Sequence, residues 1–201
     1  MAVNKPKMQN GDNPVVAPAA LLLAEIERLK ADLARAQRAI AELETRADVD
    51  PLLDILNRRG FERELARSLA YVKRYGTQAA LVFIDLDDFK AVNDRHGHAA
   101  GDALLKAVAG QLTANVRASD VVARFGGDEF VVLMWNVGEP QAAAKALELE
   151  NIIGRVDVEH GAARLSIGAS AGIVQLAADA TPARTIDAAD RAMYARKKER
   201  R

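Results

Sequence analysis

A short segment between residues 124 and 130 restricts the fold of this chain more than any other. It places two glycines and two acids, Gly126-Gly127-Asp128-Glu129, between the apolar runs 121–123 and 130–134. Apolar runs on both sides of a glycine turn indicate a β-hairpin. Two neighbouring carboxylates repel each other, and a divalent cation between them relieves that repulsion. The segment therefore predicts a hairpin with a metal site at its tip; the alternative is a surface turn with solvated acids.

The composition excludes several classes of protein. The chain has 201 residues, half of them hydrophobic, with 28 basic and 28 acidic side chains. Because these charges balance, no overall field attracts nucleic acid or an anionic membrane, and we expect neither as a partner. The chain has no cysteine, which excludes disulfides, thiolate metal sites and cysteine nucleophiles. Its three histidines lack the spacing of a zinc site.

The first residues form a polar tail. Residues 1–17 are rich in Asn, Pro, Lys and Gly without periodicity, and we expect this tail to be disordered. The apolar run 15–24 is interrupted by Pro18 and continues into a charged helical pattern, which argues against an export signal. No apolar run has the length of a membrane span, and we expect a cytoplasmic protein.

A heptad pattern follows and covers residues 18–47. Its apolar positions alternate spacings of four and three, and they are Leu22, Ile26, Leu29, Leu33, Ala36, Ile40 and Leu43. So narrow an apolar stripe predicts a coiled coil that pairs with a second copy of the chain. The alternative is one amphipathic helix folded onto the rest of the protein, which normally has a wider stripe.

The remaining residues, 50–201, fit one α+β domain. We expect strands at 79–86 and 165–174 beside the hairpin. We expect one helix over 61–76, a second from the end of the strand 79–86 through Lys90, and three more over 102–116, 141–153 and 187–199. This order corresponds to a palm-like βαββαβ fold, in which helices cover a central antiparallel sheet.

Three acids are expected to converge at one edge of that sheet. Asp85 ends the strand at 79–86, and this strand neighbours the hairpin that carries Asp128 and Glu129. Carboxylates from adjacent strands suit a two-metal site for phosphoryl or nucleotidyl transfer. Mg²⁺ is the natural ion because it binds oxygen ligands and substrate phosphates, and Mn²⁺ would also fit. A nucleotide substrate follows.

Polar residues after the first strand suggest recognition of a base. Asn93 offers an amide and Asp102 a carboxylate, and the N1–H and exocyclic amine of guanine suit a carboxylate acceptor. The alternative is that Asn93 or Asp94 lies in a turn and that Asp102 caps a helix. His96 and His98 are interpreted as structural residues.

Several motifs in the right order resemble one family. The hairpin, the stretch from Ile84 to Asp102 and Asn57-Arg58-Arg59-Gly60-Phe61 together resemble the GGDEF-domain diguanylate cyclases, and the resemblance covers residues 50–201. These enzymes condense two GTP molecules into cyclic di-GMP and release two pyrophosphates. The resemblance implies a homodimer, because two domains, each holding one GTP, must face each other.

The resemblance also implies roles at the metal site. Asp85 and Asp128 would bind metal together with the Leu86 carbonyl, and Glu129 would assist. Asp128 would also accept the proton of the attacking 3′-hydroxyl. Lys90 would stabilise charge in the transition state.

Further positions would bind substrate. Asn93 and Asp102 would bind guanine, while Phe89, Gly126 and Gly127 would border the nucleotide. Residues 190–197 resemble the closing motif of the family, in which Lys197 and Arg201 would bind phosphate.

The Arg117-Ala118-Ser119-Asp120 segment resembles an inhibitory site for the product. An Arg-x-x-Asp pattern shortly before the hairpin would bind cyclic di-GMP through Arg117 and Asp120, because guanidinium groups bind phosphate and guanine in bidentate fashion. The alternative is a solvated turn.

The chain departs from the family pattern at two places. Leu52-Leu53-Asp54-Ile55 replaces the usual Leu-Thr-Gly-Leu, and the closing motif has Arg196 and Arg200 in place of Ala and Gly. Neither change removes a metal-binding acid. We therefore expect an active cyclase; the alternative is an inactive receptor for cyclic di-GMP that signals through its coiled coil.

Overall fold

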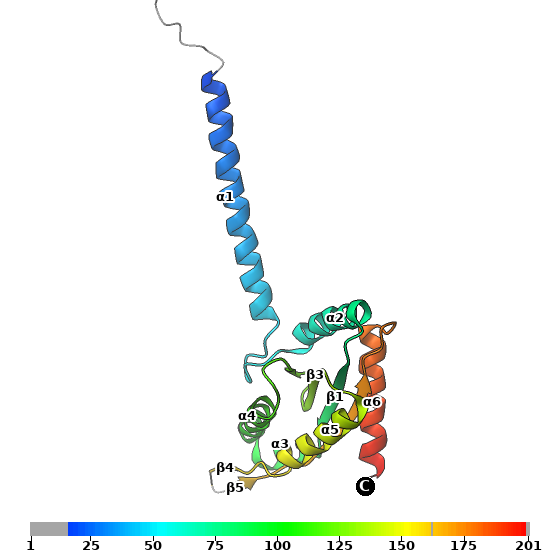
Figure 1. Ribbon diagram of the computed structural model, residues 1–201. Coiled ribbons are helices and arrows are strands. Elements are labelled where there is room, and N and C mark those ends of the chain that lie inside the picture. The colour runs from blue at the N-terminus through cyan, green and yellow to red at the C-terminus, as the bar shows by residue number, and fades with distance from the viewer. Residues whose placement is uncertain (1–15, 162, 200–201) are drawn as a thin grey trace, which may run out of the picture. The chain divides into compact units, whose positions relative to one another are not determined.

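A computed structural model describes residues 16–161 and 163–199 (Figure 1). Its internal contacts separate the chain into two units, with the boundary between Glu44 and Thr45. Each unit is described by itself.

Helix α1 spans Val16–Ala47 and so begins two residues before the expected start. The rest of the predicted tail, residues 1–15, lies outside the described residues. Within residues 21–37, four apolar heptad side chains are between 45% and 64% exposed: Leu22, Ile26, Leu29 and Leu33. Such an apolar row has no partner in its own helix, so pairing with a second chain stays a prediction.

The second unit contains a four-stranded antiparallel sheet, which confirms the predicted α+β fold. The strand order is β2-β3-β1-β6. The strands are β1 at Ala79–Leu86, β2 at Val121–Arg124, β3 at Glu129–Trp135 and β6 at Ala169–Gln175. All three neighbouring pairs are antiparallel, so β1 lies in the centre between the hairpin and β6.

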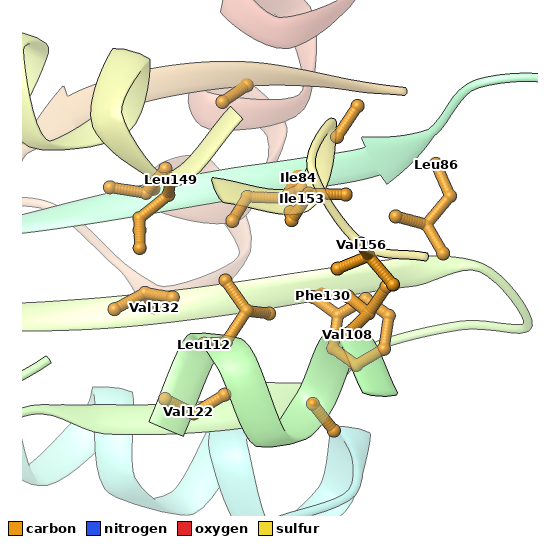
Figure 2. Packing of buried hydrophobic residues seen from close by; sticks show 14 of the residues in the cluster. Ile84, Leu86, Val108, Leu112, Val122, Phe130, Val132, Leu149, Ile153 and Val156 are labelled. Atoms are coloured by element: carbon orange, nitrogen blue, oxygen red, sulfur yellow. The ribbon is translucent and has the colours of Figure 1, made fainter. Parts of the chain in front are cut away.

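Helices cover both faces of this sheet because β1 is apolar on both sides. Val82 and Ile84 point to a core formed with α4 (His98–Ala114) and α5 (Glu139–Ile153). Figure 2 shows Val108 and Leu112 of α4 and Leu149 and Ile153 of α5 around Ile84, Phe130 and Val132. Leu81 and Phe83 point to a second core with α2 (Arg58–Tyr75) and α6 (Pro182–Glu199). Each buried side chain of this size contributes about 1.5–3 kcal/mol.

Local signals in the sequence set the ends of α2. The Asn57 side chain accepts a hydrogen bond from the Gly60 amide at its start. Gly76 ends it in the left-handed conformation, with φ of 66°. The predicted end near Gly76 is therefore confirmed.

Several predicted boundaries were wrong. The expected strand 165–174 is broken: β5 (Ala163–Leu165) pairs with β4 (Val158–His160) in a separate hairpin, and β6 begins at Ala169. At the break, Gly168 packs closely against Asp87, whose amide donates to the Gly168 carbonyl. The last helix begins at Pro182, five residues early.

A further correction concerns the corner between two helices, where the helix expected to run through Lys90 continues to His96. α3 spans Phe89–His96, and α4 begins at His98 rather than at Asp102. Gly97 separates them with φ of 84°, a conformation that favours glycine. Among the described residues no helix is long and apolar enough to cross a membrane.

Candidate active site

The predicted convergence of acids occurs at the end of β1. Asp85 lies directly opposite Glu129 in the register of β1 and β3. The amide of Leu86 donates a hydrogen bond of 3.1 Å to the carbonyl of Asp128. Asp85 therefore lies at the same edge of the sheet as Asp128 and Glu129, which are more than 40 residues away in the sequence, where the hairpin turns.

The backbone of the hairpin turn does not require its two glycines, Gly126 and Gly127. Neither Gly126 nor Gly127 has positive φ, so the turn does not need the left-handed freedom of glycine. A Cβ on Gly126 would overlap the carboxylate of Glu129, whereas a Cβ on Gly127 would meet nothing within 4 Å. Gly126 therefore makes room for the Glu129 side chain.

Arg124 stabilises the hairpin turn through hydrogen bonds. Its guanidinium donates to the carbonyls of Gly126 and Gly127, and it bonds to Asp50 at 3.1 Å. Asp50 belongs to the segment that follows α1, and this segment also pairs with β2 through Leu56 and Ala123. The hairpin tip is thus connected to the chain segment that leads into the domain.

Two of the three acids, Asp85 and Glu129, have raised pKa values. Burial raises the pKa of Asp85 most; Lys197 lowers it, and Asp128 and Asp87 raise it further. Burial also raises the pKa of Glu129, followed by the charges of Asp85 and Asp128. Both carboxylates would be stabilised in their ionised form by an added cation.

Lys197 supplies one cation to this cluster. Its ammonium forms an ion pair with Asp85 and lies 3.8 Å from a carboxylate oxygen of Asp87. The sequence assigned Lys197 to substrate phosphate, and the structure shows its present partners to be acids. Arg201, the other expected phosphate ligand, lies outside the described residues.

The acids fit Mg²⁺ in chemistry, although not yet in geometry. Among the described residues, no three His, Asp or Glu side chains already form a metal-binding group. Asp85, Asp128 and Glu129 nevertheless provide the oxygen donors that Mg²⁺ prefers. Burial, and after it the charges of neighbouring carboxylates, raises the pKa values of Asp85 and Glu129, and a divalent cation would favour their ionised forms.

The start of α3 lies directly after β1. The Phe89 side chain is buried in the core, so only its backbone can border a substrate. Lys90 is exposed on the first turn of the helix. Helix N-termini attract phosphate groups, which is consistent with the expected role of this segment.

The corner between α3 and α4 brings the two expected guanine ligands into one region. The Asn93 side-chain oxygen lies so close to Gly101 that a Cβ there would overlap it. Asp102 is the next residue, exposed on α4. The capping alternative for Asp102 was wrong, because α4 begins four residues earlier and its N-cap is Gly97.

The Arg117–Asp120 segment forms a turn between α4 and β2. The carboxylate of Asp120 accepts hydrogen bonds from the amides of Arg117 and Trp135, both at 3.1 Å. Arg117 is exposed and lines, with Asp120, a pocket of about 570 Å³. Asp120 therefore stabilises the turn, and Arg117 faces open space beside it.

Sequence reasoning missed Asp50 and Asp87. Asp50 had no expected role, and it forms an ion pair with Arg124 at the hairpin turn. Asp87 accepts a hydrogen bond from Ser170 of β6 at 2.9 Å and raises the pKa of Asp85. Its position two residues after Asp85 at the strand end was the available signal.

Comparison with known proteins identifies the family. Residues 47–201 match the family model described as "Diguanylate cyclase, GGDEF domain". The chain belongs to the GGDEF-domain family. Diguanylate cyclase TpbB of Pseudomonas aeruginosa is 39% identical over 186 residues, which cover 89% of this chain and 41% of TpbB. Probable diguanylate cyclase DgcE of Escherichia coli is 39% identical over 142 residues, 71% of this chain and 13% of DgcE. The chain thus spans less than half the length of these relatives.

Solved GGDEF domains share the fold. A sensory box/GGDEF family protein from Caulobacter crescentus is 37% identical with a TM-score of 0.70, covering 76% of this chain and 99% of that one. The coiled coil and GGDEF domain of DgcB from Caulobacter crescentus, in complex with c-di-GMP, is 25% identical with a TM-score of 0.75. That match covers 89% of this chain and 95% of the DgcB chain.

Proposed function

We propose that this chain is a diguanylate cyclase that condenses two GTP into cyclic di-GMP and releases two pyrophosphates. The observation that carries the proposal is the meeting of Asp85, Asp128 and Glu129 at the edge of the sheet. A receptor without catalysis would need none of these acids. The names of the relatives support the same activity.

Each residue has a chemical task in this reaction. The 3′-oxygen of one GTP attacks the α-phosphorus of the other, the bond to the bridging oxygen breaks, and pyrophosphate leaves. Asp128 accepts the proton of the attacking hydroxyl. Lys90 and Lys197 stabilise the negative charge on the phosphates. A second, identical step closes the ring.

The acids would hold two Mg²⁺ ions, or Mn²⁺, through Asp85, Asp128, Glu129 and the Leu86 carbonyl; these ions would neutralise phosphate charge and favour ionisation of the 3′-hydroxyl. Asn93 and Asp102 would bind the guanine edge, with Asp102 accepting from its N1–H and exocyclic amine. The backbone at Phe89, Gly126 and Gly127 would border the nucleotide.

The proposed enzyme is a homodimer. One domain provides acids and a guanine site for a single GTP, so two domains must face each other to join two nucleotides. The exposed apolar row of α1, from Leu22 to Leu33, is the proposed contact. A coiled coil would hold the two domains at a high effective concentration.

Pyrophosphate release from GTP and Mg²⁺ by the pure protein tests the proposed catalysis. Asp128→Asn should reduce the rate by at least about 10²-fold, the order expected for the loss of one preorganised electrostatic contact. Asp179→Asn, the same change at an exposed loop position, is the matched control and should keep the rate. Near-normal release by folded Asp128→Asn would overturn the assignment. Binding of cyclic di-GMP without turnover would instead support the receptor alternative.

Product inhibition at Arg117 is proposed on the same basis. The exposed Arg117 beside its pocket could bind a phosphate or guanine of cyclic di-GMP. Arg117→Ala should keep the initial rate and weaken inhibition by added product at least about tenfold, since charge-assisted bonds contribute about 1.5–3 kcal/mol. Equal inhibition of both proteins would show that this segment is only a solvated turn.

A further inference from the structure

Lys197 is placed where it competes for the proposed metal ligand. Its ammonium is bonded to Oδ1 of Asp85, and it lies 3.8 Å from Oδ1 of Asp87. The side chains of Lys197 and Asp85 are only 18% and 19% exposed, so water screens this ion pair weakly. Asp85 cannot give the same oxygen fully to an ammonium group and to a divalent cation.

The helix that carries Lys197 is held firmly against the sheet. α6 lies so close to β6 that a Cβ on Gly172 would overlap the backbone nitrogen of Met193. This contact fixes the height of α6 above the sheet, one turn before Lys197. The ammonium therefore reaches Asp85 from a rigid helix rather than from a flexible end.

The neighbouring Arg196 adds a second attachment. Its guanidinium donates to both carboxylate oxygens of Glu150 on α5, at 2.8 and 3.0 Å. Glu150 also accepts the amide of Ala171, which pairs in register with Ile84, the residue before Asp85. Because β6 is the outer strand, Arg196 connects the two helix layers across the edge of the sheet. Arg196 is one of the positions at which this chain departs from the family pattern.

We propose that Lys197 is the built-in counter-ion of the acid cluster and that a metal ion must displace it. The proposal rests on the proposed cyclase function. Metal alone would bind weakly, because it has to remove Lys197 from Asp85 without offering the ammonium another anion. A nucleoside triphosphate provides that anion, so the Lys197 ammonium moves from the Asp85 carboxylate to a phosphate of the nucleotide. Metal and nucleotide would then each raise the affinity for the other, as linkage requires.

The competing explanation is that Lys197 only binds phosphate and that its contact with Asp85 has no effect on the metal. The two explanations differ for Lys197→Met. If Lys197 only binds phosphate, the variant loses nucleotide affinity and keeps its affinity for metal alone. If Lys197 is the counter-ion, the variant loses nucleotide affinity and gains affinity for metal alone.

The experiment is a titration of the full chain with Mn²⁺ in the absence of nucleotide, followed by electron paramagnetic resonance of the free ion. Lys197→Met should bind Mn²⁺ about fivefold or more tightly than the wild type, the lower end of coupling between linked sites. Lys198→Met is the matched control: it removes the same charge from a lysine that lies over the Tyr194 ring, and it should match the wild type. The analogue 3′-deoxy-GTP lacks the attacking hydroxyl and cannot form product. Its affinity in the presence of Mn²⁺ should be lower for Lys197→Met than for the wild type.

Three outcomes separate the two proposals. Equal Mn²⁺ affinity of wild type and Lys197→Met, with loss of binding in Asp85→Asn, overturns the counter-ion proposal and keeps the metal site. Unchanged Mn²⁺ binding in Asp85→Asn overturns the metal site and, with it, the counter-ion proposal. Tighter binding in Lys197→Met and loss in Asp85→Asn supports both. Lys197→Gln, which keeps a polar side chain, replaces the methionine variant if that variant does not fold.

Discussion

The absence of a side chain at Gly126 makes room for the carboxylate of Glu129. Gly126 has ordinary φ, yet a Cβ at this position would overlap the carboxylate of Glu129. The overlap is with the far end of the flexible Glu129 side chain, so an added Cβ would displace the carboxylate without disturbing the fold. Position 126 therefore needs glycine to leave room for the Glu129 carboxylate, and not for its backbone conformation.

We predict that Gly126→Ala lowers cyclase activity about tenfold or more without lowering the melting temperature, because it displaces a carboxylate that the electrostatics of the site require. Gly127→Ala is the structural control, since a Cβ there meets nothing within 4 Å. Any loss in that control would report a substrate contact. A Gly126→Ala protein with wild-type activity would contradict the role of Glu129.

Glu129 should make the fold less stable at neutral pH than a neutral side chain would. Its pKa is raised in the folded state, mainly by burial, from an ordinary value of 4.5. A raised pKa means that folding is favoured with the proton bound, and this stability is lost as pH rises through the folded-state pKa. The site thus retains a charge that costs stability in the metal-free protein.

Glu129→Gln should therefore melt at a higher temperature than the wild type at pH 7 in the absence of divalent metal. The difference should shrink as pH falls toward 4.5, where the wild-type carboxyl is increasingly protonated in both states. Thermal melts across this range provide the measurement. A difference in melting temperature that stays constant with pH would mean that burial and like charge do not raise the pKa of Glu129.

At the scale of elements, the close approach of α6 to β6 positions the last turn of the helix at the acids. The contact at Gly172 is with backbone atoms of α6, namely the nitrogen of Met193 and the carbonyl oxygen of Ala189. Backbone cannot rotate away as a side chain can. The helix as a whole must therefore shift if this space is filled.

We predict that Gly172→Ala destabilises the domain by about 1–3 kcal/mol, the usual cost of overpacking. Gly110→Ala is the matched control, because Gly110 lies in α4 with nothing within 4 Å of an added Cβ. That change should stabilise by about 0.5–1 kcal/mol through helix propensity. Denaturant unfolding of both variants provides the values. Equal stability of Gly172→Ala and the wild type would show that α6 does not need this close approach.

The elements that sequence reasoning predicted well are those with strong local signals. The central strand was predicted residue for residue at 79–86, because the six-residue apolar run 79–84, followed by Asp85 and Leu86, allows few alternatives. The β4–β5 hairpin was missed, since its strands are only three residues long and too short for alternation to be recognised in the sequence. Gly161, with φ of 62°, was its one local signal.

The site was predicted where neighbouring strands determine it and missed where distant side chains do. Adjacent strands brought Asp85 and Glu129 together, as expected from the order of elements. The ion pair of Asp85 with Lys197 joins residues 112 positions apart and depends on how α6 packs. The departure at Asp54 has a backbone reason: with φ of 55° it holds the left-handed conformation, which an Asp tolerates.

At the scale of the whole molecule, the proposed reaction needs two chains, each holding one GTP. Charges placed in the heptad row should therefore separate the dimer and make activity depend steeply on protein concentration. We predict that Ile26→Asp with Leu33→Asp gives a monomer, folded in the domain, with much lower specific activity at nanomolar concentration. Light scattering and rate against concentration measure both effects.

Ala24→Asp with Ala31→Asp is the matched control for this pair. It adds the same charges seven residues apart on the same helix, at exposed positions outside the heptad row. The control should stay dimeric and active. If the Ile26 and Leu33 variant keeps full activity at nanomolar concentration, the coiled coil does not assemble the active pair.

The most direct test of the central claim is the identity and stoichiometry of the product. The pure full chain is incubated with GTP and Mg²⁺, and nucleotides and pyrophosphate are quantified by chromatography and mass spectrometry. We predict one cyclic di-GMP and two pyrophosphates for every two GTP consumed. GTP that stays intact, or that yields GDP and phosphate instead, would contradict it.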